Sequence, residues 1–167
     1  MKKLIVLVGP NGVGKSTTAR ALVEKCSKCA YVDSDWCRVI MPFSFTEATK
    51  RTVTENLYCL LRNYLLCEDV DTVIFTYCWH GVRKEIYENV RGKLRNDAIE
   101  FEEKIIILKC SLEENTERAR RDGRDEKRIA YGVENTFSFY DEYDYPIIDT
   151  TELTLDQVVE KIFEIVI

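Results

Sequence analysis

The chain has 167 residues, of which 46% are hydrophobic and 32% are charged, and its formal net charge is −5. This composition is typical of a single globular domain, here residues 1–167, and the acidic balance argues against a general nucleic-acid-binding protein, which needs a basic face. No apolar run is long enough to cross a membrane, so we expect a cytoplasmic protein that is a monomer or a homodimer.

A glycine-rich loop between a strand and a helix is the most specific feature of the sequence. Residues 9–16, Gly-Pro-Asn-Gly-Val-Gly-Lys-Ser, match the phosphate-binding pattern G-x-x-x-x-G-K-[ST], with an apolar strand at 3–8 before it and helical spacing after it. Lys15 can reach the terminal phosphates of a nucleoside triphosphate, and the Ser16 hydroxyl can ligate Mg²⁺. The loop residues expected to bind the nucleotide are Gly9, Pro10, Asn11, Gly12, Val13, Gly14, Lys15, Ser16 and Thr17.

The second strand-like segment, at about residues 30–33, ends in two carboxylates and an arginine. Asp33 and Asp35 are two residues apart, and Arg38 follows three residues later. One acid can hold the Mg²⁺ hydration shell while the other accepts a proton from an acceptor hydroxyl, and Arg38 can hold an anionic group. The alternative is a solvated turn that caps the next helix.

The third strand, at residues 72–77, ends in Cys-Trp-His-Gly. Many P-loop enzymes have an acidic residue near this point that organises the metal ion. Since this chain has none, metal binding is assigned to Ser16 and Asp33. Trp79 and His80 can line an acceptor pocket, and a packed aromatic ring with a surface imidazole is an equally good interpretation.

A cluster of arginines follows the fourth strand, at residues 104–109. Arg118 and Arg121 lie on one face of the expected helix, and a charged turn follows them. Phosphoryl transfer needs positive charge over the transferring group, often from a closing loop, so we expect these two arginines to be catalytic and residues of about 121–128 to form a short lid. The alternative is a solvated charged helix face.

Strands and helices alternate along the whole chain, with a fifth strand at 146–149 and a terminal helix after it. Capping-box spacing predicts three helix starts, and apolar spacing predicts a helix that runs from about Ile129 through Phe137 and Tyr140 toward Pro146. The capping pairs are Ser44 with Glu47, Ser111 with Glu114, and Thr154 with Gln157. This order predicts an α/β fold with a parallel sheet covered on both faces and ligands at the carboxyl ends of its strands.

With these residues in place, the whole chain resembles a small P-loop kinase of the nucleoside-monophosphate and shikimate kinase type. The resemblance implies a three-layer sandwich with strand order 2-3-1-4-5, Mg²⁺ with ATP as co-substrate, and nucleotide contacts from Thr150 and Thr151. It also implies that Asp33, the first acid of the pair, helps to organise the magnesium, and that Asp35, the second, contacts the acceptor hydroxyl as the catalytic base. The spacing of Asp35 and Arg38 also resembles the 5′-end kinase domain of polynucleotide kinases. The stretch from Asp35 to His80 looks most like a group of small bacterial AAA-type ATP-binding proteins.

Three functions are compatible with the sequence. The first is an ATP-dependent phosphotransferase that moves the γ-phosphoryl group to a small hydroxyl- or phosphate-bearing acceptor, with Asp35, Arg38, Trp79 and His80 at the acceptor. The second is a nucleic-acid end kinase, which the acidic net charge disfavours. The third is a nucleotide-binding ATPase that acts as a switch, for which an acceptor base such as Asp35 is unnecessary.

Overall fold

A computed structural model describes residues 1–166. Five parallel strands form one sheet in the order β2-β3-β1-β4-β5, as predicted. The strands are β1 (Lys2–Val8), β2 (Cys29–Asp33), β3 (Thr72–Thr76), β4 (Phe101–Lys109) and β5 (Ile147–Asp149).

The central strand β1 shows why this sheet is covered on both faces. Its residues Leu4, Val6 and Val8 belong to one buried cluster, while Ile5 and Leu7 belong to another. Successive side chains of a strand point to opposite faces of the sheet. Because the apolar run of β1 has side chains on both faces of the sheet, helices must cover both faces to bury it.

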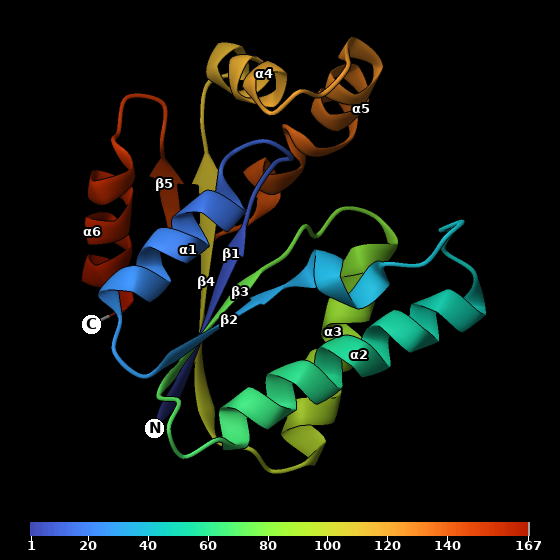
Figure 1. Cartoon of the computed structure of the whole chain (residues 1–167), viewed down its shortest axis with the longest axis vertical. Helices are drawn as coiled ribbons and strands as arrows, with labels where there is room; N and C mark the ends of the chain where they lie inside the picture. Colours follow the sequence, from blue (N-terminus) through green and yellow to red (C-terminus); the bar gives the residue numbers. More distant parts are fainter. Residues whose placement is uncertain (167) are drawn as a thin grey trace.

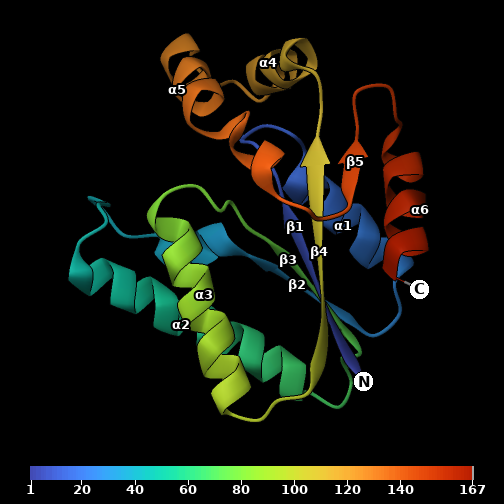
Figure 2. The same cartoon turned by 180° about the vertical axis from the view of Figure 1, so that it is seen from behind.

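Two pairs of helices supply the outer layers (Figures 1 and 2). Helices α1 (Lys15–Lys25) and α6 (Leu155–Val166) cover one face, and α2 (Glu47–Leu66) and α3 (Val82–Asn96) cover the other. The residues predicted for the inner stripe of α3, Ile86, Val90 and Leu94, are buried. These layers leave the carboxyl ends of the strands open as the place for a site.

Shorter elements surround this open edge. The 3₁₀ turn η1 (Ser34–Arg38) follows β2, while α4 (Leu112–Arg121) and α5 (Glu126–Thr136) lie beyond the ends of β1 and β4 (Figure 1). The connection between α4 and α5 is short, from residue 122 to 125, and lies within the segment predicted as a lid.

Two local predictions were wrong. Helix α2 is capped by Thr46, whose hydroxyl accepts from the Thr49 N–H while the Thr49 hydroxyl accepts from the Thr46 N–H, so the capping pair lies two residues after the predicted Ser44 pair. Helix α5 ends at Thr136 and a 3₁₀ turn, η2 (Phe139–Glu142), replaces its predicted continuation. This turn carries Tyr140 into the core, where it is fully buried.

Within residues 1–166, no helix combines the length and the apolar character needed to cross a lipid bilayer.

Candidate active site

The glycines of the phosphate loop have backbone conformations that other residues adopt poorly. Gly12 and Gly14 have φ values of 88° and 101°, in the region where a side chain is strained. A Cβ at Gly9 would lie 2.3 Å from the Leu108 carbonyl oxygen of β4, which leaves no room for any side chain. The sequence pattern G-x-x-x-x-G-K therefore follows from the tight path of this loop between β1 and α1.

Lys15 is folded over the loop that carries it. Its ammonium group donates to the carbonyl oxygens of Gly9 and Pro10, each at 2.8 Å. Loss of solvation lowers the pKa of Lys15, and the nearby Cys78, Asp35 and Asp33 oppose this change by favouring the charged form. The lysine therefore holds a cationic group directly above the loop, where a phosphate would need it.

Ser16 and Asp33 meet as the sequence predicts for a metal site. The Ser16 hydroxyl donates to Asp33 Oδ2 at 2.9 Å, and the Tyr31 hydroxyl donates to the same oxygen at 2.7 Å. Within residues 1–166, no three His, Cys, Asp or Glu side chains gather into a metal-binding cluster. A hydroxyl and one carboxylate are hard oxygen ligands, and they fit Mg²⁺ bound with nucleotide phosphates, because this ion keeps most of its ligands from water and phosphate.

Asp35 and Arg38 form a close ion pair on η1. The Arg38 Nε and Nη2 atoms donate to Asp35 Oδ1 at 3.0 and 2.7 Å. The turn itself is capped by Asp33, whose Oδ1 accepts from the Asp35 N–H at 3.0 Å. Asp33 is thus both a candidate metal ligand and the cap that positions Asp35. The capping interaction expected for a solvated turn is present, and it is compatible with a catalytic role of Asp35.

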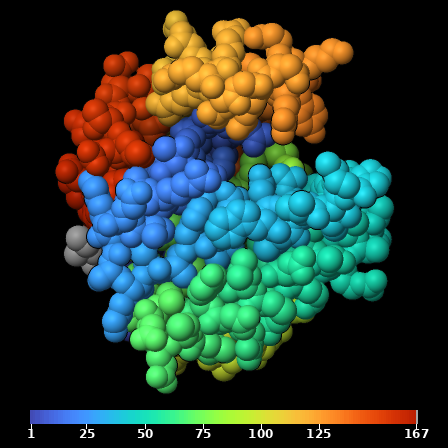
Figure 3. Space-filling model, viewed as in Figure 1, coloured from blue at the N-terminus to red at the C-terminus, as the bar shows by residue number. Residues whose placement is uncertain are grey.

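A cavity of about 390 Å³, here called the central cavity, joins these groups (Figure 3). In Figure 3 it is the depression between α4–α5 above and the segment after β2 below. It contains Lys15, Ser16, Asp33, Asp35 and Arg38 of the predicted site. Its remaining charged lining residues are Arg83, Asp122, Arg124 and Arg128. Four segments far apart in the sequence therefore converge on one charged cavity.

The segment after β3 divides between core and cavity. Trp79 is only 3% exposed and packs against the rings of Tyr87, Tyr143 and Tyr145. His80 is outside the lining of the central cavity and contacts Cys78 and Arg83. This placement favours the packed-aromatic interpretation of Trp79 over the acceptor-binding one.

Cys78 is the residue of this segment that lines the central cavity. Its Sγ lies 2.9 Å from Nδ1 of His80 and 3.6 Å from the Tyr140 hydroxyl. Burial by itself raises the pKa of Cys78, but the His80 hydrogen bond and the charges of Lys15 and His80 outweigh it and lower the pKa to about 6. This lowered pKa favours the thiolate of Cys78 at neutral pH, which would place an anionic group after β3 in the position where the sequence has no carboxylate.

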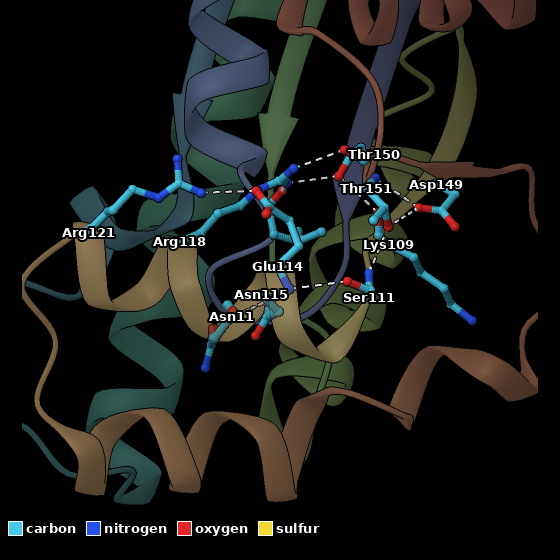
Figure 4. A network of polar contacts seen from close by, with 11 residues as sticks. Asn11, Lys109, Ser111, Glu114, Asn115, Arg118, Arg121, Asp149, Thr150 and Thr151 are labelled. Atoms are coloured by element: carbon cyan, nitrogen blue, oxygen red, sulfur yellow. Dashed lines mark hydrogen bonds and ion pairs between the residues drawn. The ribbon is translucent and has the colours of Figure 1, made fainter.

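Arg118 joins the phosphate loop to the carboxyl end of the sheet (Figure 4). Its Nη1 donates to the Val13 carbonyl at 3.0 Å and to the Thr150 hydroxyl at 2.9 Å, and its Nη2 donates to the Thr150 carbonyl. Its Nε is bound to Glu114, which also pairs with the exposed Arg121. The guanidinium of Arg118 is thus occupied by contacts with α4, the phosphate loop and Thr150.

A second cavity of about 280 Å³ lies on this side of the loop and is here called the outer cavity. Arg118, Arg121 and Thr150 line it, together with apolar side chains from the start of α6, whereas Thr151 is bound to Asp149 and to the Ser111 N–H. The apolar lining residues are Val13, Leu153, Leu155 and Val158. The predicted catalytic pair therefore lines the outer cavity, and Arg124 and Arg128 line the central one.

Several site residues carried no signal in the sequence. Asn115 is 3% exposed, and its side chain donates to the Asn11 carbonyl at 3.0 Å, while the Asn11 N–H donates to the Thr136 hydroxyl at 3.1 Å. These contacts fix the phosphate loop from α4 and α5. Arg83 and Tyr31 were also missed, because nothing in their spacing distinguishes them from surface residues.

The fold and the loop geometry define a P-loop nucleotide-binding protein of the small-kinase type. A family model described as an AAA domain matches residues 5–138, which is more than half of the chain, so the chain belongs to this family. No curated protein matches the chain in sequence.

Solved structures of small kinases share the fold over nearly the full length. A gluconokinase from Sinorhizobium meliloti 1021 is 15% identical with a TM-score of 0.65, and covers 95% of this chain and 88% of its own. The APS kinase of Mycobacterium tuberculosis, in complex with AMPPNP and APS, is 21% identical with a TM-score of 0.62, at 99% and 97% coverage. Shikimate kinase from Acinetobacter baumannii, in complex with shikimate, is 18% identical with a TM-score of 0.60, at 99% and 93% coverage.

Proposed function

We propose that this protein is an ATP-dependent kinase that moves the γ-phosphoryl group of ATP to a small acceptor. The observation that carries the proposal is that Lys15 of the phosphate loop and the carboxylate Asp35 line the same cavity. A nucleotide switch needs the loop and one carboxylate for the metal, such as Asp33, but has no use for a second carboxylate that acts as an acceptor base. The overall likeness to solved gluconokinase, shikimate kinase and APS kinase structures supports the same class of reaction.

Each residue of the central cavity has a distinct task in this proposal. The loop N–H groups and Lys15 bind the β- and γ-phosphates, while Ser16 and Asp33 hold Mg²⁺, which neutralises phosphate charge when bound. Asp35 accepts the proton of the acceptor hydroxyl as that oxygen attacks the γ-phosphorus, and the bond to the β-phosphate oxygen breaks. Arg38 binds one carboxylate oxygen of Asp35 and so leaves the other for the acceptor.

The outer cavity has the mixed lining suited to the base and ribose of the nucleotide. Its apolar side chains Leu153, Leu155 and Val158 line the same cavity as the cationic Arg118, and an adenine ring can use both kinds of contact. On this proposal Thr150 contacts the nucleotide, and Arg121 closes the outer edge. The kinase is cytoplasmic in our proposal, as expected from the sequence.

A phosphoryl-transfer screen tests this function. ATP labelled at the γ-phosphate is incubated with Mg²⁺, the protein and a panel of metabolites and nucleotides, and products are identified by mass spectrometry. We expect transfer to at least one acceptor, and Lys15→Ala should lower it by roughly 10²–10³-fold, as removal of a transition-state charge contact does, without unfolding. Slow hydrolysis that no acceptor accelerates, and that Asp35→Asn leaves unchanged, would favour the switch.

A further inference from the structure

The central cavity is positively charged in a protein that is negatively charged overall. Its charged lining comprises five cations against three carboxylates and the Cys78 thiolate, an excess of one cation, whereas the chain carries a net charge of −5. The cations are Lys15, Arg38, Arg83, Arg124 and Arg128, and the carboxylates are Asp33, Asp35 and Asp122. Lys15 lies in the phosphate loop, and Arg124 and Arg128 come from the α4–α5 segment. The other two arginines stand apart from these.

Arg38 comes from η1 and Arg83 from the first turn of α3, and both line the central cavity together with Asp35. Both also line a small pocket whose apolar lining includes Phe45 and Ile86, so their side chains lie beside apolar groups. The Arg38 guanidinium lies 5.8 Å from the centre of the Phe43 ring, and that of Arg83 lies 5.5 Å from the centre of the Phe45 ring. These stacking contacts hold the two planar groups in place.

The two arginines differ in their partners. Arg38 is paired with Asp35, and so its charge is balanced by the proposed catalytic base. Arg83 forms no ion pair with any carboxylate of residues 1–166, and its guanidinium contacts only the ring nitrogens of His80 and the face of Phe45. Arg83 is half-buried, so its guanidinium has lost part of its hydration. Without an anionic partner, no ion pair compensates the free-energy cost of that loss.

We propose that Arg83 binds an anionic group of the acceptor, a carboxylate or a phosphate, while the acceptor hydroxyl lies at Asp35. This inference rests on the proposed kinase function and names the substrate class for it. A guanidinium presents two parallel N–H groups that match the two oxygens of such an anion, and the Phe45 contact orients it before the acceptor arrives. A neutral polyol would leave Arg83 uncompensated beside the bound acceptor.

The size of the cavity limits the acceptor further. Its volume of about 390 Å³ must also contain the terminal phosphates of the nucleotide. The acceptor that remains possible is a small hydroxylated acid or a small phosphate ester.

The test uses anion binding to the full chain after the phosphate loop has been filled. The protein is saturated with Mg²⁺ and a non-hydrolysable ATP analogue, whose own affinity is measured first by calorimetry. Inorganic phosphate and, separately, acetate are then titrated as probes. We expect at least one anion to bind, and Arg83→Gln should weaken it by roughly 10- to 100-fold, the effect of losing a charge-assisted hydrogen-bond pair.

Two further variants separate the charge of Arg83 from its packing. Arg83→Lys keeps the cation and should retain part of the affinity. Arg95→Gln, on the exposed far end of α3, is the matched control and should bind the anion like the unmodified protein. A circular dichroism spectrum and the affinity for the ATP analogue show whether each variant is folded.

Each outcome decides a different point. Phosphate or acetate binding that depends on Arg83 supports the inference, and the tighter of the two probes identifies the anion. If the ATP analogue binds and neither anion does, or if Arg83→Gln binds anions as well as Arg95→Gln does, the anion site is wrong while the kinase proposal stands. If the ATP analogue itself does not bind, the proposed kinase function fails, and this inference fails with it.

Discussion

The two cavities on either side of the phosphate loop differ in what lines them. The outer cavity has apolar side chains from the start of α6 and a polar network centred on Arg118, whereas the central cavity is lined mostly by charged and polar groups. An apolar surface with a few polar contacts suits binding of a ring, and a charged cavity suits phosphoryl transfer. The difference indicates that changes in the outer cavity should alter nucleotide affinity and those in the central cavity should alter turnover.

The largest effect that follows from this comparison is expected at Asp35. Asp35→Asn keeps the shape of the side chain but cannot accept a proton, so transfer to the acceptor should fall by roughly 10²–10⁴-fold. Nucleotide affinity should change little, because Asp33 and Ser16 are untouched. Steady-state kinetics and calorimetry measure the two quantities, with the exposed Asp69→Asn as control. A collapse of nucleotide affinity with normal transfer would make Asp35 a metal ligand.

Substitutions of the arginines in the two cavities should affect different steps, phosphoryl transfer in the central cavity and nucleotide binding in the outer one. We expect Arg124→Ala and Arg128→Ala to lower kcat by roughly 10²-fold at unchanged nucleotide Kd, because they line the central cavity. Arg118→Ala should instead raise the nucleotide Kd, since Arg118 links Val13 to Thr150.

The opposite pattern would support the prediction from sequence. If Arg118→Ala and Arg121→Ala lower kcat and kcat/KM together at unchanged nucleotide Kd, then the contacts of Arg118 with Thr150 must break as the site closes. Arg20→Ala, on the exposed side of α1, is a control for the loss of a surface cation.

Cys78 allows the central cavity to be tested by pH. Because His80 and Lys15 outweigh burial and lower its pKa to about 6, its alkylation by iodoacetamide should rise between pH 5 and 7 with a midpoint near 6. Burial raises the pKa of Cys26 and Cys37 to about 11, so at pH 7 the thiolate fraction of Cys78 should be roughly 10⁴-fold larger than theirs. Because a thiolate of lower pKa is a weaker nucleophile, Cys78 should react roughly 10- to 100-fold faster than either.

Mass spectrometry of the labelled peptides measures these rates one cysteine at a time. Mg²⁺–ATP should slow the reaction of Cys78, because the thiol lines the cavity proposed for the phosphates. His80→Asn should move the midpoint to higher pH by removing the hydrogen bond to Sγ. A midpoint above pH 8 in the unmodified protein would contradict the proposed thiolate.

The smallest effect is expected in the outer cavity. Leu155 is 40% exposed and lines this cavity, so Leu155→Ala should leave the fold intact and weaken nucleotide binding only several-fold, as the loss of about 1 kcal/mol of apolar contact does. Leu112→Ala, a similarly exposed leucine on α4, is the control. An unchanged nucleotide Kd in Leu155→Ala would mean that the base lies elsewhere.

The sequence by itself determined the sheet, the loop and the first acid. The parallel sheet, the phosphate loop and the closeness of Ser16 to Asp33 follow from local patterns, because strand periodicity, glycine conformation and residues at strand ends are properties of short segments. The order of the strands came only from the resemblance to small P-loop kinases. Thr150 is tied to Arg118, which was not foreseen, and its contact with the nucleotide stays a prediction from the family resemblance.

Only the tertiary structure decided which side chains of distant segments face the same cavity. Arg83 comes from α3 and Asn115 from α4, and each contributes to the site. The spacing of residues around them in the sequence does not predict this position. Trp79 shows the reverse: it stands at a strand end where ligands are expected, yet the aromatic cluster around Tyr87 draws it into the core. The direction of a side chain next to a strand end depends on what packs against it, and that packing is complete only when the whole chain is folded.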